Sequence, residues 1–94
     1  MASTKDFRNF VLEQLRFDEI VCKPMMGEFL LYYQGKLFGG IYDNRFLIKK
    51  TNSNKKYSLA EEIPYKNAKP MYLVENLEDA EYLEQLVKET CEEL

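Results

Sequence analysis

The chain has 94 residues, of which 46% are hydrophobic and 14% aromatic. This composition argues against disorder and predicts one globular domain over residues 1–94. Its net charge of −3 conceals an asymmetry, because residues 20–74 hold nine basic and four acidic side chains, whereas residues 75–94 hold one and eight. No apolar run approaches the ~20 residues that span a bilayer, and no signal peptide is evident. We therefore expect a cytoplasmic protein in which Cys22 and Cys91 are reduced.

Amphipathic helices are predicted at both ends of the chain. Ser3 is a suitable N-cap for a helix over residues 4–16, whose apolar residues from Phe7 to Leu15 recur with the helical period. Either Asn76 or Asp79 can cap a final helix with an apolar stripe that begins at Ala80. Between the two, the sequence predicts a short helix over residues 58–63 and a strand over residues 71–74.

The segment from Met25 to Lys50 predicts three strands joined by two-residue turns. Glycine in Gln34-Gly35 accepts the positive φ that such a turn needs, and Asp43-Asn44 tolerates it. A short strand over residues 20–23 precedes this meander and ends at Pro24, which confines it to a sheet edge or a strand end.

Alternation of side chains along these strands predicts two apolar sheet faces. The predicted core face, covered by helices, consists of Leu30, Tyr32, Leu37, Ile41, Phe46 and Ile48. The predicted partner-binding face consists of Phe29, Leu31, Tyr33, Phe38, Tyr42, Arg45, Leu47 and Lys49, and it is rich in the residue types that favour interfaces. A bulge at Gly39-Gly40 would move every later residue to the other face.

The order of elements predicts an α+β fold. We expect a two-layer sandwich in which an antiparallel sheet of about five strands, with a central meander, is packed on one face by the helices from both termini.

The meander also resembles a known family. The run PMMGEFLLYYQGKLFGGIYDNRFLIK, followed by Pro70-Met71-Tyr72, is similar to the N-terminal domain of the TfoX/Sxy family, with matching positions at Met26-Gly27, Gly35-Lys36, Phe38 and Lys49. The resemblance implies an α+β domain related to regulators of bacterial competence that act on transcription with a partner regulator. Those regulators carry a C-terminal domain, so this chain is expected to be a stand-alone N-terminal domain. The resemblance implies no catalytic residues.

The residues themselves do not predict an enzyme. The chain contains no His, and therefore lacks the commonest general base and zinc nitrogen ligand. Neither cysteine has an imidazole to activate it, and adjacent acids such as Glu61-Glu62 are typical of a solvated surface. We expect no catalytic residues, no metal site and no cofactor.

Two binding functions remain open. The partner-binding face predicts a small interaction module, with that face covered by residues 50–69, by a second copy in a homodimer, or by a regulator. The alternative is direct nucleic-acid binding through the basic region 45–69, with contacts from Lys50, Lys55, Lys56, Lys66 and Lys69. A sequence pI near 5.0 is far from the basic value typical of nucleic-acid-binding domains.

Overall fold

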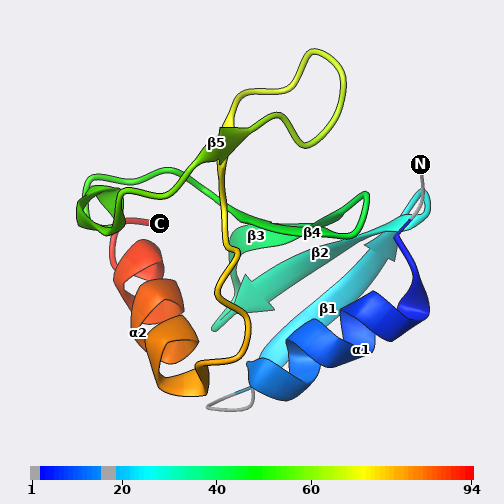
Figure 1. The fold of residues 1–94 in the computed structure, drawn as a ribbon, viewed down its shortest axis with the longest axis horizontal. Coiled ribbons are helices and arrows are strands. Elements are labelled where there is room, and N and C mark those ends of the chain that lie inside the picture. The colour runs from blue at the N-terminus through cyan, green and yellow to red at the C-terminus, as the bar shows by residue number, and fades with distance from the viewer. Residues whose placement is uncertain (1–2, 16–18) are drawn as a thin grey trace.

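A computed structural model describes residues 3–15 and 19–94 and shows one antiparallel sheet in the order β1-β2-β3-β4-β6-β5. Helices from near both termini pack on one side of this sheet (Figure 1). The predicted α+β fold with a central meander is confirmed, although the sheet has six strands. The elements are α1 (Lys5–Gln14), β1 (Ile20–Met25), β2 (Glu28–Tyr33), β3 (Lys36–Tyr42), β4 (Arg45–Ile48), the 3₁₀ turn η1 (Lys55–Tyr57), β5 (Glu61–Glu62), β6 (Met71–Leu73) and α2 (Ala80–Cys91).

The first helix begins one residue later than predicted. Thr4 is the N-cap, and its Oγ1 accepts a hydrogen bond of 3.1 Å from the Phe7 amide. Ser3 instead donates its hydroxyl to the Glu28 carboxylate at 2.6 Å and accepts from the Asn44 amide at 3.0 Å. These contacts tie the start of the chain to the turn between β3 and β4. Arg16, the predicted end of the helix, lies outside the described residues.

Two-residue turns connect the first four strands. Both central residues have positive φ in the predicted turns, with 51° and 77° at Gln34-Gly35 and 52° and 56° at Asp43-Asn44. Met26-Gly27 has the same geometry, with φ of 50° and 86°, and joins β1 to β2. Such turns match the right-handed twist of paired strands. As the predicted two-residue turns require, Tyr33 lies opposite Lys36 and Tyr42 lies opposite Arg45.

A bulge in β3 reverses part of the predicted assignment of faces. Tyr32 lies opposite Leu37, but Leu31 lies opposite Gly39, so Phe38 is an additional residue in β3. The bulge therefore comes just before Gly39-Gly40, the position where the sequence allowed for one. Leu30 and Leu37, which precede the bulge, were predicted to share a face with Ile41, which follows it. Because of the extra residue, they lie on the opposite face from Ile41.

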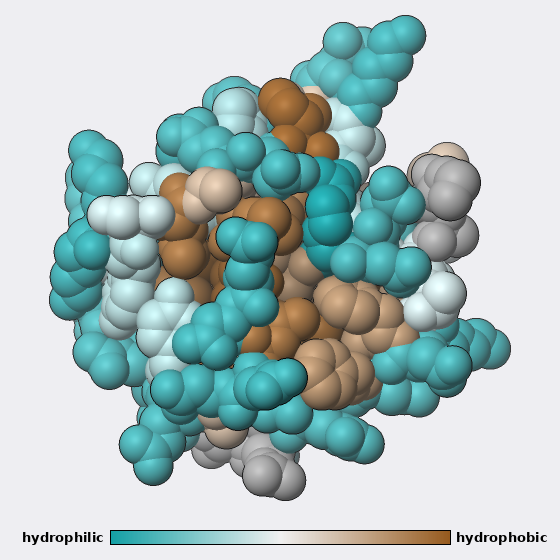
Figure 2. Space-filling model, in the orientation of Figure 1, coloured by the Kyte–Doolittle hydropathy of each residue, from teal (hydrophilic) through white to brown (hydrophobic). Residues whose placement is uncertain are grey.

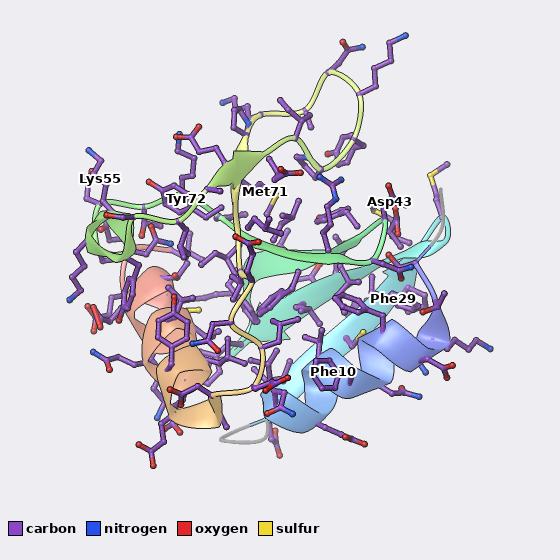
Figure 3. All side chains as sticks on the ribbon, viewed as in Figure 1. Phe10, Phe29, Asp43, Lys55, Met71 and Tyr72 are labelled. Atoms are coloured by element: carbon purple, nitrogen blue, oxygen red, sulfur yellow. The ribbon has the colours of Figure 1, made fainter. Side chains whose placement is uncertain are left out.

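The helix-covered core contains residues from both predicted faces. Phe29, Leu31, Tyr33 and Phe38, all predicted to bind a partner, are buried in this core with the helices. The Arg8 guanidinium lies 5.1 Å from the Phe29 ring centroid, on the side of the sheet that faces α1 (Figure 3). Ile41, Phe46 and Ile48 are core residues, as predicted. Leu30, Tyr32 and Leu37 were predicted to be core residues and lie half-buried on the opposite face.

The predicted helix over residues 58–63 is wrong. Ser58 has a left-handed φ of 53° and ends η1, so that it begins no helix. Glu61 and Glu62 then pair with Tyr72 and Met71 of β6 as the short edge strand β5. Strand pairing thus overrides a local helix propensity that six residues could not sustain alone. The predicted strand near residue 71 and the Asp79 cap of the last helix are confirmed.

Candidate binding surface on the open face of the sheet

One face of the sheet lies opposite both helices and carries exposed apolar side chains. We call its outer part the open sheet face, formed by Val21, Met25, Leu30, Tyr32 and Leu37. Val21 lies opposite Tyr32, and Tyr32 lies opposite Leu37, so these side chains share one side of three neighbouring strands. Val21 is 48% exposed and Met25 37% exposed. The Lys23 ammonium lies 5.1 Å from the Tyr32 ring centroid and gives this surface a cation.

The remaining residues of the predicted partner-binding face have different positions. Tyr42 and Leu47 belong to the open side of the sheet by their register, but both are buried. Tyr42 contacts the Tyr65 ring, with ring centroids 6.0 Å apart. Burial raises the pKa of Tyr42, with smaller contributions from Tyr65 and other neighbouring groups. Arg45 and Lys49 are half-buried next to the loop of residues 63–70.

A cleft of about 710 Å³ lies between the sheet and the loop of residues 63–70. In Figure 1 this loop follows β5 and projects away from the side that carries the helices. We call this space the loop-covered cleft. Its lining residues are mostly apolar and come from four strands, the loop and the chain after β4: Met25, Leu30, Leu37, Gly39, Tyr42, Lys49, Lys50, Pro64, Tyr65, Ala68, Lys69, Pro70 and Met71. The labelled Met71 marks the position of β6 in Figure 3.

The Arg45 guanidinium fixes the start of this loop. Its Nη1 lies 2.7 Å from the Glu62 carboxylate, and its Nη2 donates to the carbonyl oxygens of Ile63 and Pro64 at 3.2 and 3.4 Å. Its Nε also donates to the Tyr42 carbonyl at 3.2 Å. The planar fork of an arginine suits such a set of acceptors. Arg45 therefore joins β4 to the loop and holds the loop over the cleft.

The cations predicted to contact nucleic acid come from different segments of the fold and differ in their contacts, although Lys50 and Lys55 line one small pocket together. Lys50 pairs with Glu61 at 3.0 Å, and Lys56 pairs with Glu89 at 2.5 Å. Lys66 is exposed in the loop of residues 63–70, whereas Lys55 projects outward from the chain near η1 (Figure 3). Of the predicted contacts, only Lys50 and Lys69 line the loop-covered cleft, together with Lys49. Nucleic-acid binding stays a prediction.

A polar network attaches the segment of residues 51–57 to α2. The buried Asn54 donates to the Thr90 hydroxyl at 2.9 Å and to the Lys49 carbonyl at 2.8 Å. Glu89 accepts hydrogen bonds from Lys56, Tyr57 and Gln85, which lower its pKa to about 2. Burial, followed by the hydrogen bond to Glu89, raises the pKa of Tyr57 to about 12. These pKa shifts therefore arise from the contacts that attach residues 51–57 to α2.

The two cysteines are poor nucleophiles. Both are free thiols, and burial raises the pKa of Cys22 and raises that of Cys91 to about 11. Both thiols are therefore protonated at neutral pH. Within residues 3–15 and 19–94, no group of three His, Cys, Asp or Glu side chains is arranged to hold a metal ion. Neither helix in the described part of the chain is long and apolar enough to cross a membrane.

Comparison with known proteins does not place the chain in a family. No family model matches it, and no curated protein matches it.

Sequence reasoning missed most of the residues that form the loop-covered cleft. Pro64 and Pro70 bracket the loop, and the cleft also contacts Ala68 and Met71. The pair of prolines was a signal for an ordered loop, because each proline restricts the backbone. Nothing in the local sequence shows that this loop folds back over the sheet, because the contact that holds it joins Arg45 to Glu62, which are 17 residues apart in the chain.

Proposed function

We propose that this protein is a small cytoplasmic interaction module without enzymatic activity, and that it binds another protein chain through the open sheet face. A second copy, giving a homodimer, is one such partner, and a transcription regulator of the kind implied by the TfoX/Sxy resemblance is another. The observation that carries this proposal is the 48% exposure of Val21 and the 37% exposure of Met25 beside the half-buried Tyr32.

The chemistry of this surface supports protein binding over catalysis. Exposed apolar groups that cluster on one surface gain free energy when a partner removes them from water. Methionine and tyrosine adapt well to such contacts, because methionine is flexible and tyrosine combines an apolar ring with a polar group. The surface offers no nucleophile activated by a base among the described residues.

Site-specific photo-crosslinking tests this proposal. A photoreactive benzoylphenylalanine replaces Val21 in one variant and Ile63 in another, which is matched because Ile63 is also 48% exposed but lies outside the open sheet face. After illumination in cells, we expect a crosslinked species of defined mass from position 21 and none from position 63. Mass spectrometry then identifies the crosslinked chain as a second copy or another protein. Equal crosslinking at both positions, or none at position 21, contradicts the proposal.

A further inference from the structure

The loop-covered cleft differs from the open sheet face in shape. Its volume of about 710 Å³ lies within the range of roughly 300–1,000 Å³ that is typical of small-ligand sites. Val21 and Tyr32 of the open sheet face do not line this cleft, whereas Met25, Leu30 and Leu37 contribute to both surfaces. The cleft also includes Pro64, Tyr65 and Ala68 of the loop, which are not part of the open sheet face. The cleft can therefore have a binding property of its own.

Apolar groups form most of the cleft. Leu30, Leu37 and Tyr42 come from the sheet, and Tyr65 and Ala68 come from the loop opposite. Figure 2 shows that apolar residues reach the surface of this molecule in places, between rims of hydrophilic residues. A ligand that fills this cleft needs an apolar body, because a fully polar molecule would lose hydration there without finding hydrogen-bond partners.

The charges at the cleft are all of one sign. Lys49, Lys50 and Lys69 line it, and no Asp or Glu is among the described residues that do. Lys50 has its carboxylate partner in Glu61, whereas the ammonium groups of Lys49 and Lys69 have no ion pair or hydrogen bond with any described residue. Arg45 and Lys56, close by in sequence, are both paired with carboxylates. Two cations that have no partner among the described residues thus lie beside an apolar surface, where an anion interacts more strongly than in bulk water.

The backbone around these groups is held in place without a ligand. The Lys49 amide donates to the Phe38 carbonyl at 2.8 Å, and the Lys49 carbonyl accepts from Asn54 at 2.8 Å. Arg45 fixes the start of the loop that carries Lys69. A site that is formed before binding loses little conformational freedom when a ligand enters.

We propose that the loop-covered cleft binds a small molecule that combines an apolar chain or ring with one carboxylate group. The apolar part lies between the sheet and the loop, and the carboxylate is bound by Lys49 and Lys69. This proposal goes beyond the protein-binding function and does not depend on it.

Calorimetry with three probes of equal chain length tests the proposal on the full chain. The probes are decanoate, decanol and decyltrimethylammonium, each below the concentration at which it forms micelles. We expect decanoate to bind about tenfold more tightly than decanol, because two surface lysines each contribute up to about fivefold to an ion pair. A fourth probe, octanoate, should bind roughly fifteenfold more weakly than decanoate, because it is two methylenes shorter and each buried methylene contributes about fourfold. Equal affinity for decanoate and decyltrimethylammonium, or no binding of decanoate, overturns the proposal.

Matched variants locate the site. The double variant Lys49→Gln/Lys69→Gln should bind decanoate about tenfold more weakly. Lys55→Gln/Lys66→Gln removes the same charge at exposed positions that do not line the cleft, and should bind like the wild type. An equal loss of decanoate affinity in both double variants would show a nonspecific charge effect and would overturn the proposed site.

A third variant tests the apolar part of the cleft. Ala68→Trp places a large side chain in the cleft and should abolish decanoate binding while the melting temperature stays near that of the wild type. Unchanged binding by a folded Ala68→Trp variant overturns the location. Failure of photo-crosslinking at position 21 leaves this result unaffected, so the two proposals fail separately.

Discussion

The ionisation of Glu89 makes the stability of the fold depend on pH. Its pKa of about 2 lies below the ordinary value of 4.5, because hydrogen bonds from Lys56, Tyr57 and Gln85 favour the carboxylate. The folded state therefore binds the proton less tightly than the unfolded state, and Glu89 contributes stability above pH 4.5 that is lost as the pH falls toward 2. We expect Glu89→Gln to reduce stability at neutral pH. We also expect the loss of stability between pH 4.5 and pH 2 to be less steep in this variant than in the wild type.

Chemical denaturation at a series of pH values measures this effect. Glu92→Gln is the matched control, because Glu92 is an exposed acid near the same end of α2. The control should keep the pH dependence of the wild type. An identical pH profile for Glu89→Gln and the wild type would show that the hydrogen bonds of Glu89 contribute nothing to the fold.

Gly39 permits the close approach of β4 to the bulged strand β3. A Cβ atom at this position would overlap the Leu47 carbonyl oxygen and would lie 2.9 Å from the Ile48 Cα. Because both are backbone atoms, they cannot move aside by a side-chain rotation. We expect Gly39→Ala to destabilise the protein by about 1–3 kcal/mol, measured by urea unfolding. Gly35→Asn is the control, since a turn at φ of 77° with no neighbour within 4 Å accepts asparagine at smaller cost.

The position of the loop of residues 63–70 depends on one side chain, that of Arg45. Arg45→Met removes the hydrogen bonds to Ile63 and Pro64 and the ion pair with Glu62. We expect faster amide hydrogen exchange throughout the loop and a loss of about 1 kcal/mol in global stability, because the group is partly exposed. Lys50→Met removes a more exposed pair and should leave exchange in the loop unchanged. Equal exchange in both variants would contradict the role of Arg45.

The strands of the meander show how far local sequence predicts this fold. Gly35 and Asn44 favour positive φ, so the turns and the register beside them could be predicted from a few neighbouring residues. The extra residue Phe38 could not be assigned in the same way, because Gly39-Gly40 indicates that a bulge is possible near this point but not whether one forms or which residue it adds. That one residue reversed the faces of Leu30 and Leu31 and therefore of half of the predicted partner-binding residues.

At the scale of the whole molecule, the charge asymmetry of the sequence has a partial structural explanation. The acidic C-terminal segment contacts the basic segment of residues 51–57, through the ion pair of Lys56 with Glu89 in α2 and the hydrogen bond from Ser53 to Glu93 after it. The ammonium groups of Lys49 and Lys69, which line the loop-covered cleft, form no ion pair with α2 or with residues 92–94. A net acidic protein thus keeps a local basic site, which the total charge did not predict.

Both proposed binding surfaces depend on which face of the sheet is open, and thiol labelling tests this directly. In a background with Cys22→Ser and Cys91→Ala, the variants Leu30→Cys and Leu31→Cys place a thiol on opposite faces at neighbouring positions. We predict that a maleimide reagent labels position 30 rapidly in the folded protein and position 31 only as the protein unfolds, since Leu31 is 0% exposed. Rapid labelling at position 31 together with protection at position 30 would contradict the account, because the helices would then cover the face that we assign to binding.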